Sequence, residues 1–545
     1  MPPRIALVTG RRARSHVESI VSELRQATGW AIDVVEAPID VAALIPRDML
    51  EKLLRSIHGR YDIVIVPGTL DYSLEGLDDA AGAAVVRGPS DPDSLRLLAE
   101  LGEEGLQRLA EQGRLDPSLL LDKWLEELRE HHASTRCVDV CGVRVPIRPP
   151  PIVVAAELFV EHGASAEAVA EQAAELLERG GDILVAGFGQ GWDREEALRV
   201  LRALVDRAGP VAVDTPDKML ALEAARRGLS CLTMSLSEGD PLFEKLPRKS
   251  PVVVIPLDSS FNVPRGAAER VRLLEHLVRH AERAGLIPIA DPMVDPPGWG
   301  LAQSVTAYVE AASRLPETPM LAGIANVYEL VDADTHGQIA VLTQLFAEAG
   351  ASLMLVTEKS RKAAMAVTEA SIAATMTSVS LLKKRWPKDL GVDLLYAKEK
   401  RPRSGSPRLP RKPRLVLDAS SLAEWYGFRQ DRVGSHIIVV EDGVIRDVYI
   451  GRRGVVELRG RSAKDIYKAV SYLGLAREPS HYAYLGYELC RAELAAVMKR
   501  SYVQDEPLLT PPWARCRRYS ARSMSVAGQS NGDSKAEEKP RGEKG

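Results

Sequence analysis

The 545-residue sequence has no strong excess of either charge. Its 71 Lys and Arg residues against 75 Asp and Glu residues leave a formal net charge of -4, and the pI is about 6.3. Proteins that bind nucleic acids usually present a basic face, because the phosphate backbone supplies most of the affinity. The composition therefore argues against a nucleic acid partner.

Long hydrophobic runs are also missing. No apolar stretch approaches the roughly 18 residues needed to cross a bilayer. The N-terminal sequence MPPRIALVTG has no apolar signal-peptide core before its first strand-like segment. We therefore expect no membrane partner and a cytoplasmic location.

Cysteine is scarce, with five residues in the whole chain, and only Cys137 and Cys141 are close in sequence. In a strand this spacing directs both thiols to one face. No second pair of Cys or His residues supplies the other ligands of a zinc site. We predict buried structural thiols and no metal site.

The chain is long enough for two to four domains. Residues 1–148 alternate strand-like and amphipathic segments, which is typical of a small parallel α/β domain. Residues 149–397 follow a proline-rich hinge, and residues 398–414 are a basic, proline-rich linker. We predict an α+β domain over 415–512, with a hairpin around Asp442-Gly443, and a disordered tail over 513–545.

The block 149–397 contains eight apolar runs, most of them followed by a helical segment. These predicted strands are IVVAAELF, DILVAGF, PVAVDT, CLTMSL, PVVVIPLD, IPIADP, PMLAGI and SLMLVT. Eight such units over about 245 residues are typical of a (β/α)8 barrel, and a doubly wound open sheet is the alternative. The predicted fold class is α/β, a central TIM barrel flanked by the small parallel α/β domain and the α+β domain.

The turn Thr9-Gly10-Arg11-Arg12 follows the first predicted strand. Its composition suits a phosphate-binding loop, but it lacks the G-x-G-x-x-G spacing. A solvated turn is the favoured interpretation.

Polar residues stand at the predicted strand ends of the barrel, and these ends share one mouth where active sites form. Helix capping is the alternative explanation. It does not account for Asp214, because Thr215 and Pro216 can begin the next helix, or for Asp291, which precedes a long loop. The candidates in chain order are Glu157, the glycine loop with Gly187, Gly189 and Gly191, then Asp214, Ser235, Asp258, Asp291, Asn326 and Glu358.

Carboxylates and one carboxamide, with no histidine cluster, form a poor metal site and suit a nitrogen heterocycle. A carboxylate can accept two parallel hydrogen bonds from an amine and a ring N–H, while an Asn side chain both donates and accepts. A pterin presents such an edge. The strand ends therefore predict a pterin site.

Three of these segments resemble the dihydropteroate synthase superfamily of pterin-binding barrels, and especially its archaeal dihydropteroate synthase-like branch. VAVDT resembles the third-strand Asp-Thr motif, which implies that Asp214 binds the pterin. IPIADP resembles the sixth-strand Asp-Pro motif and implies the same for Asp291. GIANV resembles the Gly-x-x-Asn-Val of methyltetrahydrofolate:corrinoid methyltransferases and implies that Asn326 bonds the pterin near N5.

The resemblance also assigns the remaining site residues. Ser235 stands where a synthase has a pterin-binding Asn. GGDILVAGFGQG occupies the place of the glycine loop, which implies a phosphate-binding role for Gly187, Gly189 and Gly191.

The seventh and eighth strand ends depart from the synthase pattern, which has Ser-Arg-Lys and Arg-x-His there. The seventh loop, NVYELVDADTHG, is acidic. In T-E-K-S-R-K after the eighth strand, Lys359, Arg361 and Lys362 are the candidate catalytic cations. Solvated residues at the start of a helix are the alternative, because cations are not favoured at that helix end.

The resemblance implies condensation of a hydroxymethyl-dihydropterin pyrophosphate with an arylamine, in folate or tetrahydromethanopterin biosynthesis. Pterin and arylamine are the implied small-molecule partners, Mg²⁺ is expected with the pyrophosphate, and a homodimer is compatible with it. Transfer of a methyl group from a methylated pterin to a corrinoid protein is the first alternative. A non-catalytic pterin-binding protein is the second.

Overall fold

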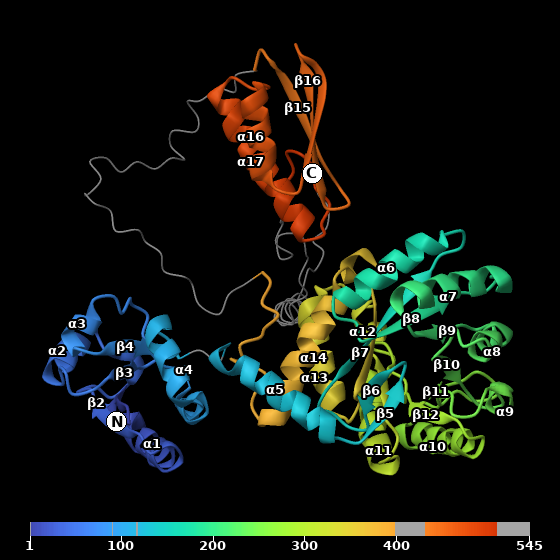
Figure 1. Ribbon diagram of the computed structural model, residues 1–545, viewed down its shortest axis with the longest axis horizontal. Coiled ribbons are helices and arrows are strands. Elements are labelled where there is room, and N and C mark those ends of the chain that lie inside the picture. The colour runs from blue at the N-terminus through green and yellow to red at the C-terminus, as the bar shows by residue number, and fades with distance from the viewer. Residues whose placement is uncertain (1, 90, 116–117, 398–430, 509–545) are drawn as a thin grey trace, which may run out of the picture. The chain divides into compact units, whose positions relative to one another are not determined.

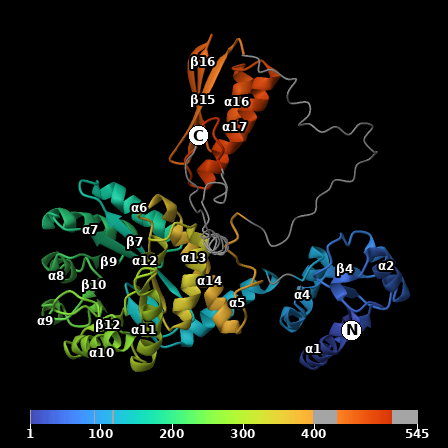
Figure 2. The same cartoon turned by 180° about the vertical axis from the view of Figure 1, so that it is seen from behind.

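The computed structural model describes residues 2–89, 91–115, 118–397 and 431–508 (Figures 1 and 2). The chain divides into two compact units, Met1–Pro407 and Arg408–Gly545. The predicted linker (398–414), the predicted tail (513–545) and residues 415–430 lie outside the described residues. Within the described part, none of the helices combines the length and the apolar character required of a membrane span.

The N-terminal α/β domain is built on a four-stranded parallel sheet of order β2-β1-β3-β4. Alternate strand residues face opposite sides, so that Ile5 and Leu7 pack with α1, whereas Ala6 and Val8 pack with α2 and α3. The strands are β1 (Arg4–Thr9), β2 (Ala31–Glu36), β3 (Ile63–Val66) and β4 (Ala84–Arg87). The helices are α1 (Arg14–Thr28), α2 (Arg47–Ser56), α3 (Leu77–Ala81) and α4 (Leu98–Gln112), with short 3-10 turns η1 (Arg11–Ala13), η2 (Ala42–Leu44) and η3 (Pro92–Leu97).

The eight predicted strands of the second block form one parallel sheet of order β12-β11-β10-β9-β8-β7-β14-β13. An isolated parallel bridge joins Ala290, at the end of β12, to Met320, just before β13. This bridge brings the two edges of the sheet together, so the predicted barrel is confirmed and the open-sheet alternative is wrong. The strands are β7 (Val153–Val160), β8 (Ile183–Phe188), β9 (Val211–Asp214), β10 (Leu232–Leu236), β11 (Pro251–Val254), β12 (Ile287–Ala290), β13 (Leu321–Gly323) and β14 (Leu353–Thr357).

Helices surround the barrel strands (Figure 1) and bury the outward-facing strand residues, such as Val154, Leu184 and Val213, in one large apolar cluster. Ser165 and Asp193 cap α6 and α7, because their side chains accept from backbone N–H groups of the first turn. The helices are α6 (Ala166–Glu178), α7 (Arg194–Ala208), α8 (Lys218–Arg226), α9 (Leu242–Lys245), α10 (Ala267–Arg283), α11 (Leu301–Arg314), α12 (Ala325–Tyr328), α13 (Thr335–Glu348) and α14 (Ala366–Lys383), with the 3-10 turn η4 (Arg361–Ala363).

The amino-terminal end of the barrel is filled by a hairpin of β5 (Cys137–Val140) and β6 (Val143–Pro146) that follows α5 (Ser118–Ser134). Val140 and Val145 of this hairpin are buried in the interior cluster with Val153, Ile183 and Leu353, which open their strands. The hairpin therefore packs with the barrel, although it precedes residue 148. The domain boundaries drawn from the sequence stay predictions.

The prediction of buried structural thiols is wrong. Cys141, in the turn of the β5–β6 hairpin, forms a disulfide with Cys231, which directly precedes β10. Cys137 is a half-buried free thiol and Cys490 is an exposed one. The two bonded cysteines are 90 residues apart in sequence, and only the packing of the hairpin against the barrel brings them together. Cys516 lies outside the described residues.

The C-terminal unit is α+β, as expected. β15 (Gly434–Glu441) and β16 (Val444–Gly451) form the predicted hairpin, and β17 (Gly454–Gly460) adds a third antiparallel strand that was not predicted. α16 (Ala463–Leu473) and α17 (Pro479–Val497) pack on one face of this sheet and share a core with Ile445 and Tyr449.

Candidate functional site at the barrel mouth

The inner face of β7 carries a carboxylate toward the barrel mouth. Val153 and Ala155 face the barrel interior, and Glu157 continues this alternation two residues further along. A Cβ atom on Gly187 of the neighbouring strand would lie only 2.8 Å from Glu157 Oε1. The Glu157 carboxyl therefore lies across Gly187, and a larger side chain at position 187 would displace it. β7 continues to Val160, so Glu157 is inside the strand and not at its end.

Asp214 is the last residue of β9 and pairs in register with Gly187. Asp214 and Glu157 are thus neighbours at the mouth, both half-buried. In the part of the chain that the structure describes, neither carboxyl accepts a hydrogen bond from a protein group. A half-buried acid without a protein partner is typical of a functional site, because a structural acid is normally satisfied.

The surroundings shift the protonation of both groups. Burial raises the pKa of Glu157 to about 7; the nearby charge of Asp214 adds to this rise and Lys359 opposes it. Burial also raises the pKa of Asp214 to about 6, and Lys218 opposes that rise. Both shifts favour the protonated form, so near neutral pH each carboxyl can donate a hydrogen bond when protonated as well as accept one.

Two lysines approach this pair. The Lys359 ammonium lies 4.5 Å from the centre of the Phe159 ring, a cation–π contact at the mouth. Lys218, the first residue of α8, lies 2.6 Å from an Asp240 carboxylate oxygen and donates to the Ser235 carbonyl. Lys218 was not among the predicted site residues. Its only sequence signal is its place one turn after Asp214, which is equally expected of a helix start.

Asp291 lies directly after β12 and has protein partners. Its Oδ1 accepts from the Met293 backbone N–H at 2.7 Å and lies 2.7 Å from the hydroxyl of Tyr308. Burial raises the pKa of Asp291 to about 6, while the bonds from Tyr308 and Met293 oppose the rise. This carboxyl is therefore held in one orientation by the protein.

Asn326 lies on the short helix α12 just past β13 and is exposed. Its Nδ2 donates to the Val294 carbonyl at 3.0 Å, in the loop that begins at Asp291. Asp291 and Asn326 are thus joined through one loop. Ser235 is half-buried inside β10, at the point where the register to β11 shifts.

The three candidate cations after β14 have different surroundings. Lys359 and Arg361 are exposed. Lys362 donates to the Val331 carbonyl at 2.7 Å, which fixes it to the acidic seventh loop. Only Lys359 is brought beside the carboxyl pair.

The predicted phosphate-binding glycines lie at and after the end of β8. Gly187 leaves room for the Glu157 carboxyl, and Gly191 has a φ of +87°, which favours glycine. A phosphate-binding role for Gly187, Gly189 and Gly191 stays a prediction.

Two other strand-end acids have local structural tasks. Asp258 accepts from the backbone N–H groups of Ser260 and Asn262. Glu358 accepts from the Arg179 guanidinium at 2.7 Å and from the N–H of Val367 at the start of α14. Helix and turn capping therefore explains these acids, in contrast to Glu157 and Asp214.

The central part of the chain is thus a (β/α)8 barrel with a polar, partly unsatisfied mouth, the end of this fold at which active sites form in enzymes. Residues 430–505 match the PterinBD-DUF4346 family model. The chain is 26% identical over 538 residues to an uncharacterized protein of Methanocaldococcus jannaschii, covering 92% of this chain and 98% of that one. The predicted resemblance is therefore supported at two points: residues 430–505 match a family model named for pterin-binding proteins, and nearly the whole chain is similar to an uncharacterized protein of an archaeon.

Solved structures of dihydropteroate synthases are also similar. The enzyme of Thermus thermophilus is 20% identical with a TM-score of 0.36, and the match covers 46% of this chain and 100% of that one. The enzyme of Xanthomonas albilineans in complex with 7,8-dihydropteroate is 21% identical with a TM-score of 0.32, and that match covers 45% and 97% of the two chains.

Proposed function

We propose that the barrel mouth binds a pterin and condenses a hydroxymethyl-dihydropterin pyrophosphate with an arylamine. The observation that carries the proposal is the pair of half-buried carboxyls, Asp214 and Glu157, which have no protein partner among the described residues. Asp214 would accept the 2-amino and N3 hydrogens of the pterin. Asp291 and Asn326, which are joined through one loop, would hold the opposite edge.

The reaction needs charge neutralisation more than acid–base work. The amine nitrogen forms a bond to the exocyclic carbon, the bond from that carbon to oxygen breaks, and pyrophosphate leaves with the electron pair. Lys359, exposed at the mouth, would stabilise the departing charge. Glu157 would accept the proton that the amine loses, since burial raises its pKa to about 7, near the optimum for a general base.

Mg²⁺ is expected to enter with the pyrophosphate. The described residues include no group of three or more His, Cys, Asp or Glu side chains that could hold a metal ion. Mg²⁺ commonly uses one or two carboxylates together with phosphate oxygens of the substrate. The ion is therefore treated as part of the substrate, which is compatible with the donors present.

The test is to incubate the purified chain with the dihydropterin pyrophosphate, Mg²⁺ and either aminobenzoate or a ribosylated aminobenzene. Release of pyrophosphate that depends on the arylamine is the expected result. Asp258→Asn should keep this activity, whereas Asp214→Asn should lose it. If the pterin binds and no pyrophosphate appears with any arylamine, the synthase proposal fails.

Methyl transfer from a methylated pterin to a corrinoid protein is the alternative. It is favoured because Lys362, a candidate for neutralising pyrophosphate, is fixed to the Val331 carbonyl of an acidic loop. Under this alternative, a methyl group appears on an added corrinoid protein and no pyrophosphate is formed.

A further inference from the structure

The N-terminal α/β domain has a crevice at the carboxyl ends of two adjacent strands. After β1 the chain passes to α1, which packs on the sheet face of Ile5 and Leu7. After β3 it passes to α3, which packs on the opposite face with Val64 and Val66. Since β1 and β3 are neighbours, their following loops diverge. In open α/β sheets such a switch point is where ligands bind.

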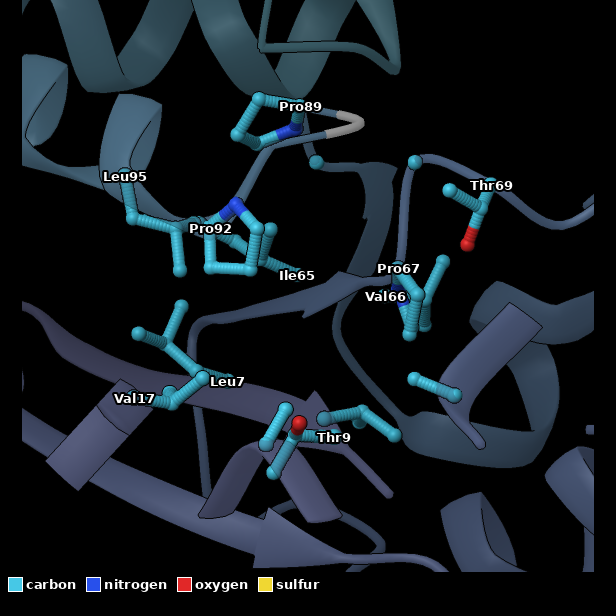
Figure 3. A pocket seen from close by; sticks show the side chains of 15 residues that line it. Leu7, Thr9, Val17, Ile65, Val66, Pro67, Thr69, Pro89, Pro92 and Leu95 are labelled. Atoms are coloured by element: carbon cyan, nitrogen blue, oxygen red, sulfur yellow. The ribbon is translucent and has the colours of Figure 1, made fainter. Parts of the chain in front are cut away.

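A cavity of about 90 Å³, open to solvent on one side, lies at this switch point. Figure 3 shows Leu7, Val17, Pro92 and Leu95 on one side of the space and Val66, Pro67 and Thr69 on the other, with Thr9 between them. Its walls therefore come from the ends of β1 and β3, from the start of α1 and from the loops after β1, β2, β3 and β4. The full set of lining residues is Leu7, Val8, Thr9, Ala13, Val17, Ala42, Ile65, Val66, Pro67, Gly68, Thr69, Gly88, Pro89, Pro92 and Leu95.

The lining is unsuited to a phosphate. None of the lining residues is charged, and the prolines at positions 67, 89 and 92 have no N–H to donate. The N–H groups of Arg11 and Arg12 already donate to the carbonyls of Ile39 and Asp40. The guanidinium of Arg11 faces the carboxylates of Glu36 and Asp40. These contacts favour the turn interpretation of Thr9–Arg12 over a phosphate-binding loop.

The cavity is instead suited to an uncharged, largely apolar group. Aliphatic and proline side chains cover its sides, and the hydroxyls of Thr9 and Thr69 supply polar atoms at its edge. Among the described residues, the Thr9 hydroxyl makes one long contact of 3.5 Å, to the Gly10 carbonyl. A ligand group can therefore replace that contact at little cost.

Close backbone packing holds the wall after β3 and β4 in place. The Gly88 N–H donates to the Val66 carbonyl at 2.8 Å, and the Gly68 N–H donates to the Pro89 carbonyl at 3.2 Å. A Cβ atom on Gly68 would lie 2.2 Å from the Gly88 carbonyl oxygen. The cavity is thus preformed, which lowers the entropic cost of binding.

We propose that this cavity binds an uncharged, single-ring aromatic compound that carries an amide, amino or hydroxyl group at one edge. An engineered protein cavity of about 150 Å³ holds one benzene molecule. The space here is smaller, about 90 Å³, but it is open to solvent on one side, so the proposed ligand inserts its ring and leaves its polar edge at the opening. This is a ligand site separate from the barrel mouth, and it does not depend on the reaction proposed there.

The test uses the full chain and matched pairs of probes that differ only in charge, nicotinamide against nicotinate and benzamide against benzoate, measured by saturation-transfer NMR and calorimetry. At least one neutral probe should bind, at least tenfold more tightly than its anionic partner. Ala13→Leu and Ala42→Leu, which fill the cavity from two different loops, should each weaken this binding at least tenfold. Ser15→Leu, on an exposed position of α1, should leave it unchanged.

Equal binding of neutral and anionic probes, no binding of either neutral probe, or binding that both cavity-filling variants retain would overturn the proposal. Thermal unfolding of each variant shows whether it is folded, and the second filling variant serves if the first is not. Pterin binding at the barrel mouth, measured in the same variants, should not change. If the unmodified chain does not bind a pterin, that result counts against the proposed function and not against the cavity proposal.

Discussion

At the scale of single residues, the acids near the barrel mouth differ in whether the protein satisfies their hydrogen bonds. The Asp258 carboxylate is satisfied by two backbone N–H groups of its own turn. Asp214 is half-buried and accepts no hydrogen bond from the described protein groups, while burial raises its pKa to about 6. Burial penalises the charged form of this carboxyl, and no hydrogen bond from the described protein groups offsets that penalty. Such an acid is available to bind a ligand.

Replacing Asp214 by Asn should weaken pterin binding by about 1.5 to 3 kcal/mol, the range for a hydrogen bond to a charged group. The amide can accept one hydrogen bond but not two in parallel. Asp258→Asn is the matched control and should not change the affinity. Titration of the purified variants with a pterin measures both, and an unchanged affinity for Asp214→Asn removes this residue from the site.

Replacing Glu157 by Gln should stabilise the fold at high pH. Folding raises the pKa of Glu157 from 4.5 to about 7. The folded state therefore binds more protons than the unfolded state between these values, and stability falls as the pH rises through this window. We expect Glu157→Gln to raise the free energy of unfolding at pH 8 by roughly 1 to 3 kcal/mol and to change little at pH 4.

Chemical denaturation at pH 4 and at pH 8 measures this difference. Glu358→Gln is the contrasting variant, because it removes an ion pair with Arg179 and a bond from the Val367 N–H, and it should destabilise at pH 8. The same stability change for Glu157→Gln at both pH values would show that ionisation of Glu157 is not penalised in the fold.

At the scale of elements, backbone contacts between loops decide which glycines are required. A Cβ atom on Gly68 would lie 2.2 Å from the Gly88 carbonyl oxygen, whereas one on Gly337, in helix α13, would meet nothing within 4 Å. Gly68→Ala should lower the stability of the N-terminal domain by at least about 2 kcal/mol. Gly337→Ala should be neutral or stabilise by about 0.5 to 1 kcal/mol, because Ala favours a helix.

Hydrogen exchange of β1 and β3 distinguishes the two variants. Faster exchange in the Gly68→Ala chain alone is the expected result. If the amide hydrogens of β1 and β3 exchange as slowly in the Gly68→Ala chain as in the unmodified chain, the loops after β3 and β4 can move apart without loss of stability.

The elements also show which structural features the sequence patterns could predict and which they could not. Each predicted barrel strand forms, because its apolar run is buried on both faces and is bounded by turn residues. β17 was missed because GVVELRG combines exposed Val455 with two charged residues and follows a two-residue turn. The Cys141–Cys231 disulfide was missed because a strand pattern carries no information about a partner 90 residues away.

At the scale of the whole molecule, the two compact units have separate cores. Ile445, Tyr449, Val470 and Leu489 belong to a cluster made only of residues beyond 430. A chain that ends at Pro407 should therefore unfold within about 2 °C of the same transition in the full chain. It should also keep its pterin affinity if the barrel alone forms the site.

Differential scanning calorimetry of the full and shortened chains measures the first expectation, and pterin titration measures the second. A fall in the barrel transition by more than about 5 °C would show that the C-terminal unit stabilises it. Loss of pterin binding with an unchanged transition would show that the C-terminal unit contributes to the site.

The sequence by itself determined the eight strands of the barrel, their order along the chain and the acids near their ends, because periodicity and strand-end position are local properties. It favoured Asp214, because Thr215 and Pro216 can begin the next helix without it, but it could not distinguish Glu157 from Asp258 and Glu358, since all three are acids at or near predicted strand ends. Only the tertiary structure decided which of them found partners in the protein, because hydrogen bonding and burial depend on neighbours far apart in the chain. The same reason applies to Lys218, to the disulfide and to the cavity between β1 and β3.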